Sequence, residues 1–288
     1  MKIKSFIAFA TAAAATFGLS ACGSSSSSDG SSASASQSAS ASSAGETTKL
    51  VVGVSPVPHA QIVQYVKDNL AQKAGLDIQI KEYQDYVTPN RALNDGEIDA
   101  NFFQHVPYFD EETKTKGYKL EHGDGIHIEP IGIYSSKVKD LKDLPNNAVI
   151  AINNDPSNQS RGLRALENAG ILTFTDQENP TTTGIASNPK NVTFKVAEAP
   201  AIPKLLPDVD AAIINGNFAV ENNLTPSKDA LYLESGENNP YSNVLAWKKD
   251  APADKLAAIK KLDDLLHSQD VKDYISKTWS DGSVIASF

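Results

Sequence analysis

Short apolar runs alternate with amphipathic helical patterns along the chain after residue 48. Short runs of apolar and β-branched residues predict strands. The predicted strands are 49–54, 77–83, 98–103, 131–135, 149–153, 192–196, 211–214, 230–233 and 244–247. Helical patterns separate most of them, and such alternation favours parallel sheets joined by helical crossovers. The pattern therefore predicts an α/β fold.

Two helical regions have a clear apolar face. The first spans His59–Lys73 and is closed by Gly75; its apolar face consists of Ile62, Val63, Val66 and Leu70. The second lies near the C-terminus, with an apolar stripe of Leu256, Ile259, Leu262 and Leu266. Helical spacing of this kind predicts that both faces are core.

Residues 85–109 have a different character, because aromatic, acidic and amide side chains are crowded there. Pro89 and Gly96 are typical of the start and the end of a short helix. In the strand that follows, Asp99, Asn101, Phe103 and His105 alternate and so share one face. That face is too polar for a core and too aromatic for a solvated surface. It indicates the wall of a small-molecule cleft, with a half-buried strand of mixed polarity as the alternative.

Arginine is rare, and Arg161 is the most informative of the three. It follows the turn-and-cap segment 153–160, which leads from a predicted strand into a predicted helix. A helix N-terminus presents free N–H groups and partial positive charge, and a guanidinium beside it can clamp a carboxylate with two parallel hydrogen bonds. The alternative is an arginine on a solvated helix face, which is our interpretation of Arg164.

Two asparagines are further candidates. Asn215 follows the strand 211–214, at the strand end where α/β proteins bind ligands. Asn243 lies just before the strand 244–247. An amide offers an acceptor for an ammonium and a donor for a carboxylate. Either residue could instead be an ordinary turn-forming asparagine.

The N-terminus predicts where the protein is located. A short basic region precedes the apolar stretch 6–17, which is too short to span a bilayer. Residues 19–23, Leu-Ser-Ala-Cys-Gly, resemble the lipobox of bacterial lipoproteins. We therefore predict a signal peptide at 1–21, lipidation of Cys22 and a flexible Ser/Ala-rich tether at 22–48. Cys22 is the only cysteine, which excludes an intrachain disulfide.

Charge and motifs exclude several functions. The formal net charge is −9, which argues against nucleic acid or anionic lipid as a partner. No nucleophile elbow, zinc-protease motif or phosphate-binding loop occurs, so we predict no enzyme and no cofactor. His122, Asp124 and His127 lie in a glycine-containing loop without metal-ligand spacing, so no metal site is predicted. The four histidines outside the cleft, His59, His122, His127 and His267, are interpreted as surface or capping residues.

The run D-Y-x-x-P-N-x-A-L-x-x-G-x-I-D-A-N-x-F-Q-H-x-P-Y at 85–108 resembles the hallmark of one family. These are the NlpA-type lipoproteins, the methionine-binding proteins of bacterial ABC importers. The segment 153–161 is similar to the family's N-D-P-[ST]-N-x-x-R motif. Asn215 and Asn243 match its I-N and P-Y-x-N motifs, with Ser242 where the family commonly has valine.

The resemblance implies a bilobed periplasmic-binding-protein fold of type II, with two lobes of mixed or parallel sheet flanked by helices. Lobe one is expected at 49–130 and 247–288 and lobe two at 131–246, with crossovers near 130–136 and 241–247. The C-terminal helices would pack on lobe one. The resemblance further implies a ligand site formed by Tyr86, Phe103, His105, Arg161, Asn215 and Asn243.

The implied function is a receptor, lipid-anchored on the extracytoplasmic face of the cell membrane, that binds L-methionine and presents it to an ABC permease and its ATPase. One alternative keeps the fold and binds another apolar amino acid or a methionine-containing dipeptide. A second is a surface lipoprotein that acts as an adhesin or antigen.

Overall fold

Two main β-sheets organise the chain. The structure, a computed structural model, describes residues 47–175 and 180–288. The six-stranded sheet has the order β13 (Ile285–Ala286), β4 (Leu120–Ile128), β12 (Ser242–Lys248), β3 (Ala100–His105), β1 (Thr48–Val54), β2 (Leu76–Glu82). The five-stranded sheet has the order β11 (Tyr232–Leu233), β5 (Gly132–Tyr134), β10 (Ala211–Ile214), β6 (Val149–Asn153), β9 (Thr193–Ala197). A small sheet joins β7 (Thr173–Phe174) to β8 (Ile185–Ser187).

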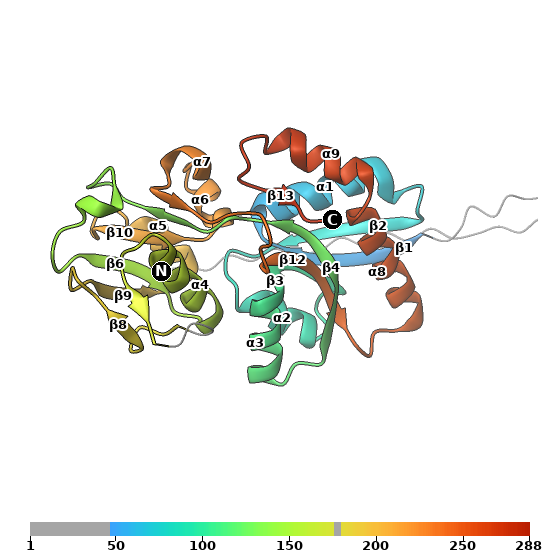
Figure 1. Ribbon diagram of the computed structural model, residues 1–288. Coiled ribbons are helices and arrows are strands. Elements are labelled where there is room, and N and C mark those ends of the chain that lie inside the picture. Colours follow the sequence, from blue (N-terminus) through green and yellow to red (C-terminus); the bar gives the residue numbers. More distant parts are fainter. Residues whose placement is uncertain (1–46, 176–179) are drawn as a thin grey trace, which may run out of the picture. The chain divides into compact units, whose positions relative to one another are not determined.

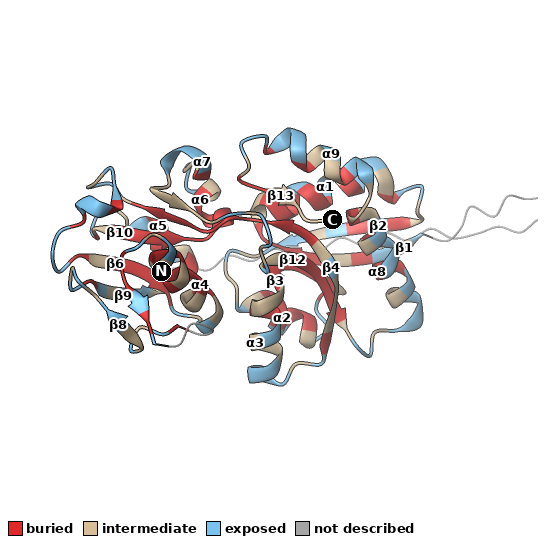
Figure 2. Ribbon diagram, viewed as in Figure 1, coloured by how far each residue is buried: buried red, intermediate tan, exposed pale blue. Residues whose placement is uncertain are grey.

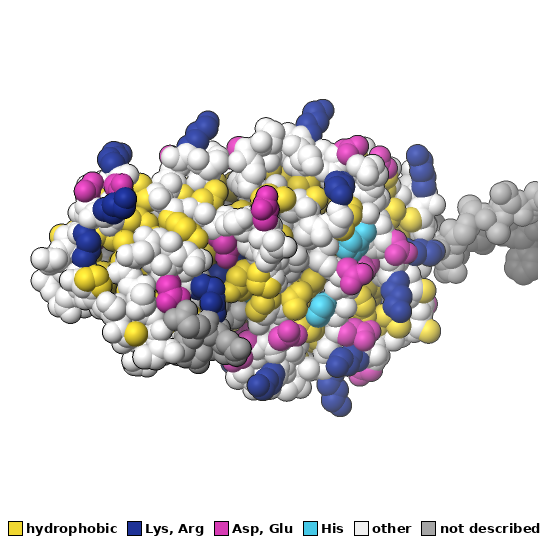
Figure 3. Space-filling model, in the orientation of Figure 1, with side chains coloured by type: hydrophobic (Ala, Val, Ile, Leu, Met, Phe, Trp, Pro, Cys, Tyr) yellow, Lys and Arg dark blue, Asp and Glu magenta, His cyan; other side chains and the backbone are white. Residues whose placement is uncertain are grey.

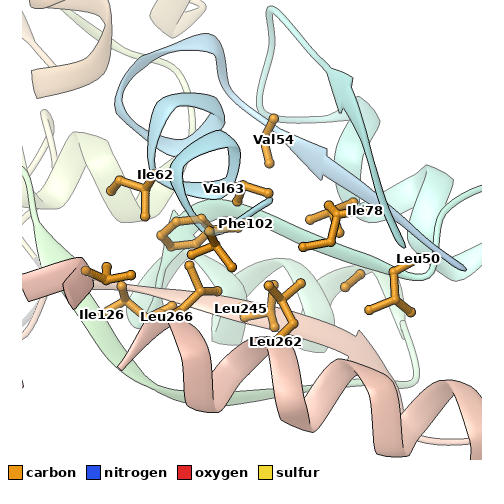
Figure 4. Close-up of a cluster of buried hydrophobic side chains, with 14 of the residues drawn as sticks. Leu50, Val54, Ile62, Val63, Ile78, Phe102, Ile126, Leu245, Leu262 and Leu266 are labelled. Atoms are coloured by element: carbon orange, nitrogen blue, oxygen red, sulfur yellow. The ribbon is translucent and has the colours of Figure 1, made fainter. Parts of the chain in front are cut away.

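Lobe one is the six-stranded sheet with helices on both faces (Figure 1). One face carries η1 (Pro56–Ala60), α1 (Gln61–Val66), η2 (Lys67–Ala71), α8 (Ala253–Leu266) and α9 (Gln269–Thr278). Apolar side chains from these helices interdigitate with those of the strands, as Figure 4 shows for Leu262 and Leu266 against Leu245. The predicted C-terminal stripe is therefore core, as expected. On the other face lie α2 (Thr88–Asn94) and α3 (Val106–Lys116).

Lobe two is the five-stranded sheet, which also has two apolar faces. One face packs against α4 (Pro156–Asn168) and the other against α5 (Ile202–Leu205) and α6 (Gly216–Glu221). The remaining helices are η3 (Leu141–Asp143), η4 (Ala199–Ala201) and α7 (Pro226–Asp229). In both lobes the central strands are largely buried and the outer helical faces exposed (Figure 2). Each lobe thus has its own core.

The chain passes between the lobes twice. It leaves lobe one between β4 and β5, at residues 129–131, close to the predicted position. It returns between β11 and β12, at residues 234–241. All of β12 pairs with β3 and β4 of lobe one, so the predicted boundary at 246/247 is wrong and falls inside a strand. Sequence could not place it because β12 is apolar enough for either core.

Two local predictions need correction. The supposed loop around His122 and His127 is β4, a nine-residue strand that pairs with β12 and β13. Its glycines and charges hide it from a propensity pattern, and pairing with its neighbours decides its conformation. The strand predicted at 98–103 begins instead at Ala100. Gly75 and Gly96 end their helical segments as predicted, with φ of +71° and +77°.

The predicted signal peptide, Cys22 and most of the tether lie outside the described residues. Within the described ranges, none of the helices has the length and apolar character needed to cross a bilayer. On the face shown in Figure 3, acidic and basic side chains of the described residues are interspersed around apolar ones. Thr48, the last residue of the predicted tether, already belongs to β1.

Candidate functional site

One buried cavity is lined from both lobes. All six predicted site residues contribute to it, as do six others that the prediction did not include. The lining consists of Tyr86, Phe103, Gln104, His105, Tyr108, Glu129, Asn158, Arg161, Asn215, Gly216, Asn217 and Asn243. The structure therefore brings together residues that lie up to 157 positions apart in the sequence.

His105 ends β3 and caps α3. Its Nδ1 accepts a hydrogen bond from the Tyr108 backbone N–H at 3.1 Å, so its proton lies on Nε2. Nε2 then donates to Oδ1 of Asn158 in lobe two, also at 3.1 Å. Burial, reinforced by the positive charge of Arg161, lowers the pKa of His105 to about 3. The imidazole is therefore neutral, and its one N–H donates the hydrogen bond to Asn158 that links the lobes.

An aromatic wall surrounds Tyr86. Its ring lies 6.1 Å from Phe103, 5.8 Å from Tyr108 and 5.1 Å from Phe218 of lobe two, measured between centroids. Its hydroxyl donates to Oδ1 of Asn217 at 2.5 Å, a second polar link between the lobes. Burial raises the pKa of Tyr86 well above its usual value, so the hydroxyl stays protonated. These rings offer apolar surface with few free polar atoms.

The strand face predicted to line the cleft is only partly correct. Phe103 and His105 line the cavity, whereas Asn101 is held in a buried amide network with Asn90 and Gln104. Asp99 precedes β3 and accepts from the Val51 N–H and from Lys255. Asn101 and Gln104 therefore tie α2 to the sheet, because buried amides must find partners, whereas Asp99 links β1 to α8.

Arg161 lies in the second turn of α4, which Asp155 caps by accepting from the Asn158 N–H. Its Nε and Nη2 bind the carboxylate of Glu234, at 3.2 and 2.5 Å, and Nη2 also donates to the Glu129 carbonyl at 2.8 Å. The expected two-pronged clamp is thus already made with a carboxylate of the protein. Among the described residues, Nη1 alone of its nitrogens has no acceptor.

Asn215 belongs to a chain of amides in lobe two. Its Oδ1 accepts from Asn153 at 2.9 Å and its Nδ2 donates to Asn158 at 2.7 Å. Asn158 therefore accepts from both Asn215 and His105 through one oxygen. The prediction did not include Asn158, although it stands in the same N-D-P-S-N segment that singled out Arg161. Its position three residues before the arginine, on one helix face, is the signal that could have found it.

Glu129 is a second charged group beside the cavity, and the sequence analysis did not include it. It follows β4 in the first crossing, and its Oε1 lies 2.8 Å from Nε2 of His127 and 3.3 Å from Nε2 of His59. His59 also lies 3.1 Å from Oδ1 of Asn243. Burial raises the pKa of Glu129, although His59 and Arg161 oppose the shift. Gly216 allows the close approach of α6, since a Cβ there would lie 2.8 Å from the Glu129 Cβ.

His59 and His127 are fully buried, so their interpretation as surface or capping residues is wrong. Burial lowers the pKa of His59 to about 4 and that of His127 to about 3, which leaves both neutral. With Glu129 they form a group whose ligand atoms lie within 4.8 Å of one another and could hold a metal ion. However, Nδ1 of His127 has no hydrogen-bond partner among the described residues, whereas metal-bound histidines are normally oriented by one. The group is better described as a hydrogen-bonded support for Glu129.

The cavity is small. Its volume is about 20 Å³, which is room for roughly one water molecule. The lobes are therefore closed on each other, joined by the His105–Asn158 and Tyr86–Asn217 bonds. A ligand of amino-acid size enters only if these contacts open.

Two α/β lobes joined by two crossings, with a polar cavity lined by both, define a substrate-binding protein of the bilobed type II class. The chain belongs to the NlpA lipoprotein family, whose sequence profile matches residues 50–288.

Relatives of known name support this assignment. The chain is 41% identical to the methionine-binding lipoprotein MetQ of Bacillus subtilis over 243 residues, covering 82% of this chain and 87% of that protein. It is 36% identical to the D-methionine-binding lipoprotein MetQ of Escherichia coli, over 81% of this chain and 86% of the relative. A nutrient binding protein from Burkholderia cenocepacia, solved bound to methionine, has a similar structure, with a TM-score of 0.77 and 41% identity. That match covers 83% of this chain and 100% of the other.

Proposed function

We propose that this protein is a lipid-anchored extracytoplasmic receptor that closes around L-methionine and delivers it to an ABC importer. The observation that carries the proposal is the pairing of a buried cation, Arg161, with a buried carboxyl group, Glu129, in one cavity that also has an aromatic wall. A free amino acid needs all three features. The methionine-binding relatives support the choice of ligand.

The two charged groups suit the two ends of a zwitterion. Nη1 of Arg161 would meet the ligand carboxylate, because the other guanidinium nitrogens are engaged. Glu129 would meet the ammonium, with its carboxylate fixed by His59 and His127. Charge-assisted hydrogen bonds are stronger than neutral ones, and more so where water is excluded. A ligand cation also offsets the burial that raises the pKa of Glu129.

The side chain of the ligand would lie against Tyr86, Phe103 and Tyr108. Sulfur–aromatic contacts contribute about 0.3–1.5 kcal/mol each beyond burial, which favours a thioether over an aliphatic chain. Asn243 would add a donor, because its Oδ1 is used by His59 while its Nδ2 has no acceptor among the described residues. Tyr86, Phe103, His105, Arg161, Asn215 and Asn243 thus remain our proposed ligand site, now with Glu129 and Asn158.

Delivery follows from opening and closing. The two crossings at 129–131 and 234–241 are the segments about which the lobes would move. A permease with its ATPase would bind the closed form and then favour the open form, which releases the ligand. Lipid on Cys22 would keep the receptor near that partner. As a binding protein, the chain would need no catalytic group.

Thermal denaturation with added amino acids tests the proposal. L-Methionine should raise the melting temperature, by mass action on the folded state, while L-leucine and L-glutamate should raise it little. Mass spectrometry of ligand carried through purification gives an independent identification. Equal stabilisation by leucine would favour a receptor for apolar amino acids in general, and stabilisation only by methionine-containing dipeptides would favour a peptide receptor. No stabilisation by any of these ligands would leave the adhesin alternative.

A further inference from the structure

We infer that Glu234 is a positioning residue that braces Arg161 from outside the cavity and thereby sets the affinity of the site for a carboxylate. The inference rests on the proposed function, since it takes the ligand to be an amino acid whose carboxylate meets Arg161. Glu234 was not among the predicted site residues and does not line the cavity.

The guanidinium of Arg161 is held along one edge and over one face. Nε lies 3.2 Å from both carboxylate oxygens of Glu234, and Nη2 lies 2.5 Å from Oε2. The ring of Tyr241 covers the plane, with its centroid 4.2 Å from Cζ. A bidentate carboxylate and a stacked ring together fix the plane of a guanidinium.

Glu234 approaches Arg161 from the side away from the cavity. Arg161 lines the cavity and is 3% exposed, whereas the Glu234 side chain is 17% exposed and lines a separate outer groove with Arg164 and Tyr241. A carboxylate that competed with the ligand would have to lie in the cavity. Glu234 therefore acts as a support and not as a plug.

The brace is tied to both crossings between the lobes. Glu234 opens the second crossing, and its backbone N–H donates to the Ile131 carbonyl of the first at 3.0 Å. Its Oε2 accepts from the Ile131 N–H at 3.3 Å, and Arg161 donates to the Glu129 carbonyl beside it. The orientation of Nη1 thus depends on the two crossings, the segments about which the lobes would move. Without the brace, the long arginine side chain would regain rotamer freedom that binding must remove again.

The pair of ligands L-methionine and L-methioninamide isolates this role, because the amide lacks the carboxylate and keeps the rest. Glu234→Gln preserves size and removes the charge. Calorimetric titration should show methionine affinity falling about tenfold or more, the scale of one charge-assisted hydrogen bond, with methioninamide affinity falling by less than about threefold. Glu237→Gln, an exposed glutamate on the same crossing, is the matched control and should change neither value.

Three results would overturn the inference. Equal losses for both ligands would mean a general structural role, an unchanged methionine affinity would mean no brace, and a gain would mean that Glu234 competes with the ligand. If the wild type binds neither ligand, the proposed function fails, and the brace is judged separately by ligand-free melting temperatures of Arg161→Gln, Glu234→Gln and the double variant. The brace predicts that the double variant melts no lower than the less stable single variant. Additive lowering would contradict it.

Discussion

The Nε2–H of His105 in lobe one donates to Oδ1 of Asn158 in lobe two, at 3.1 Å inside the candidate site. The same oxygen accepts from Asn215, so one amide joins β3 of one lobe to two elements of the other. Because Nδ1 of His105 caps α3, the ring cannot rotate without breaking a helix cap. The closed arrangement of the lobes and the geometry of the ligand site therefore depend on the same side chain.

Asn158→Ala should weaken both ligand binding and the ligand-free fold. It leaves the buried donors of His105 and Asn215 unpaired, at a cost of about 1–3 kcal/mol for each unsatisfied group. Urea denaturation and calorimetric titration measure the two effects. Asn168→Ala, at an exposed position of the same helix, is the control. A stability of Asn158→Ala equal to that of the control would mean that water replaces the amide without loss.

Arg161→Ala should weaken methionine binding far more than Arg164→Ala. Arg161 is buried beside the cavity, whereas Arg164 is half-buried and lines the outer groove. Loss of one partner of a buried charge pair costs about 2–5 kcal/mol, which weakens affinity by roughly tens to thousands of fold. Arg161→Lys should also lose methionine affinity, since a single ammonium cannot bind Glu234 in two places and still offer a donor to the ligand carboxylate. Calorimetric titration of the three variants measures their methionine affinities. If Arg161→Ala binds methionine within a few-fold of the wild type, Arg161 does not bind the ligand carboxylate.

Glu221→Gln should change how stability depends on pH. Burial, reinforced by Glu129, raises the pKa of Glu221 to about 7, against the opposing bond from Asn217. A raised acid pKa means that its stabilisation is complete below pH 4.5 and is lost as the pH rises to about 7. Because the side chain is only half-buried, solvent screening reduces the loss to about 1–2 kcal/mol.

The measurement for Glu221 is urea denaturation of both proteins at pH 4.5 and pH 8. The difference in unfolding free energy should shift in favour of Glu221→Gln at the higher pH. His59 and His127 have lowered pKa values of about 4 and 3, so their contribution runs the other way: it is present above pH 6.5 and lost on acidification. Taking mutant minus wild type cancels that term. A difference that does not vary with pH would contradict the raised pKa.

Cys22→Ala should abolish lipid attachment, so that the protein becomes soluble or keeps its signal peptide. The reason is the lipobox-like segment 19–23, in which the cysteine sulfur is the attachment point. Metabolic labelling with a fatty-acid analogue, followed by membrane fractionation, checks this. Ser24→Ala, in the tether, should label normally. Equal labelling of Cys22→Ala and the wild type would show that Cys22 is not the site of lipid attachment.

Sequence by itself determined the alternation of strands and helices, and with it the α/β class. Apolar periodicity is a local property, so the stripes at Ile62 and Leu262 could be assigned to core directly. The contiguous motif at 85–108 and the N-D-P-S-N segment likewise predicted Arg161 and the aromatic residues that line the cavity, because the residues of each motif are near neighbours in the chain.

Only the tertiary structure decided the rest. Glu129, His59 and His127 form one cluster although their sequence neighbours give no common motif, and β4 exists because β12 and β13 pair with it. Only tertiary contact places Asn101 in a hydrogen bond with Asn90 and pairs Arg161 with Glu234, 73 residues away. The physical reason is that burial, pKa and hydrogen-bond partners depend on what surrounds a group in space, and chain order does not encode that locally.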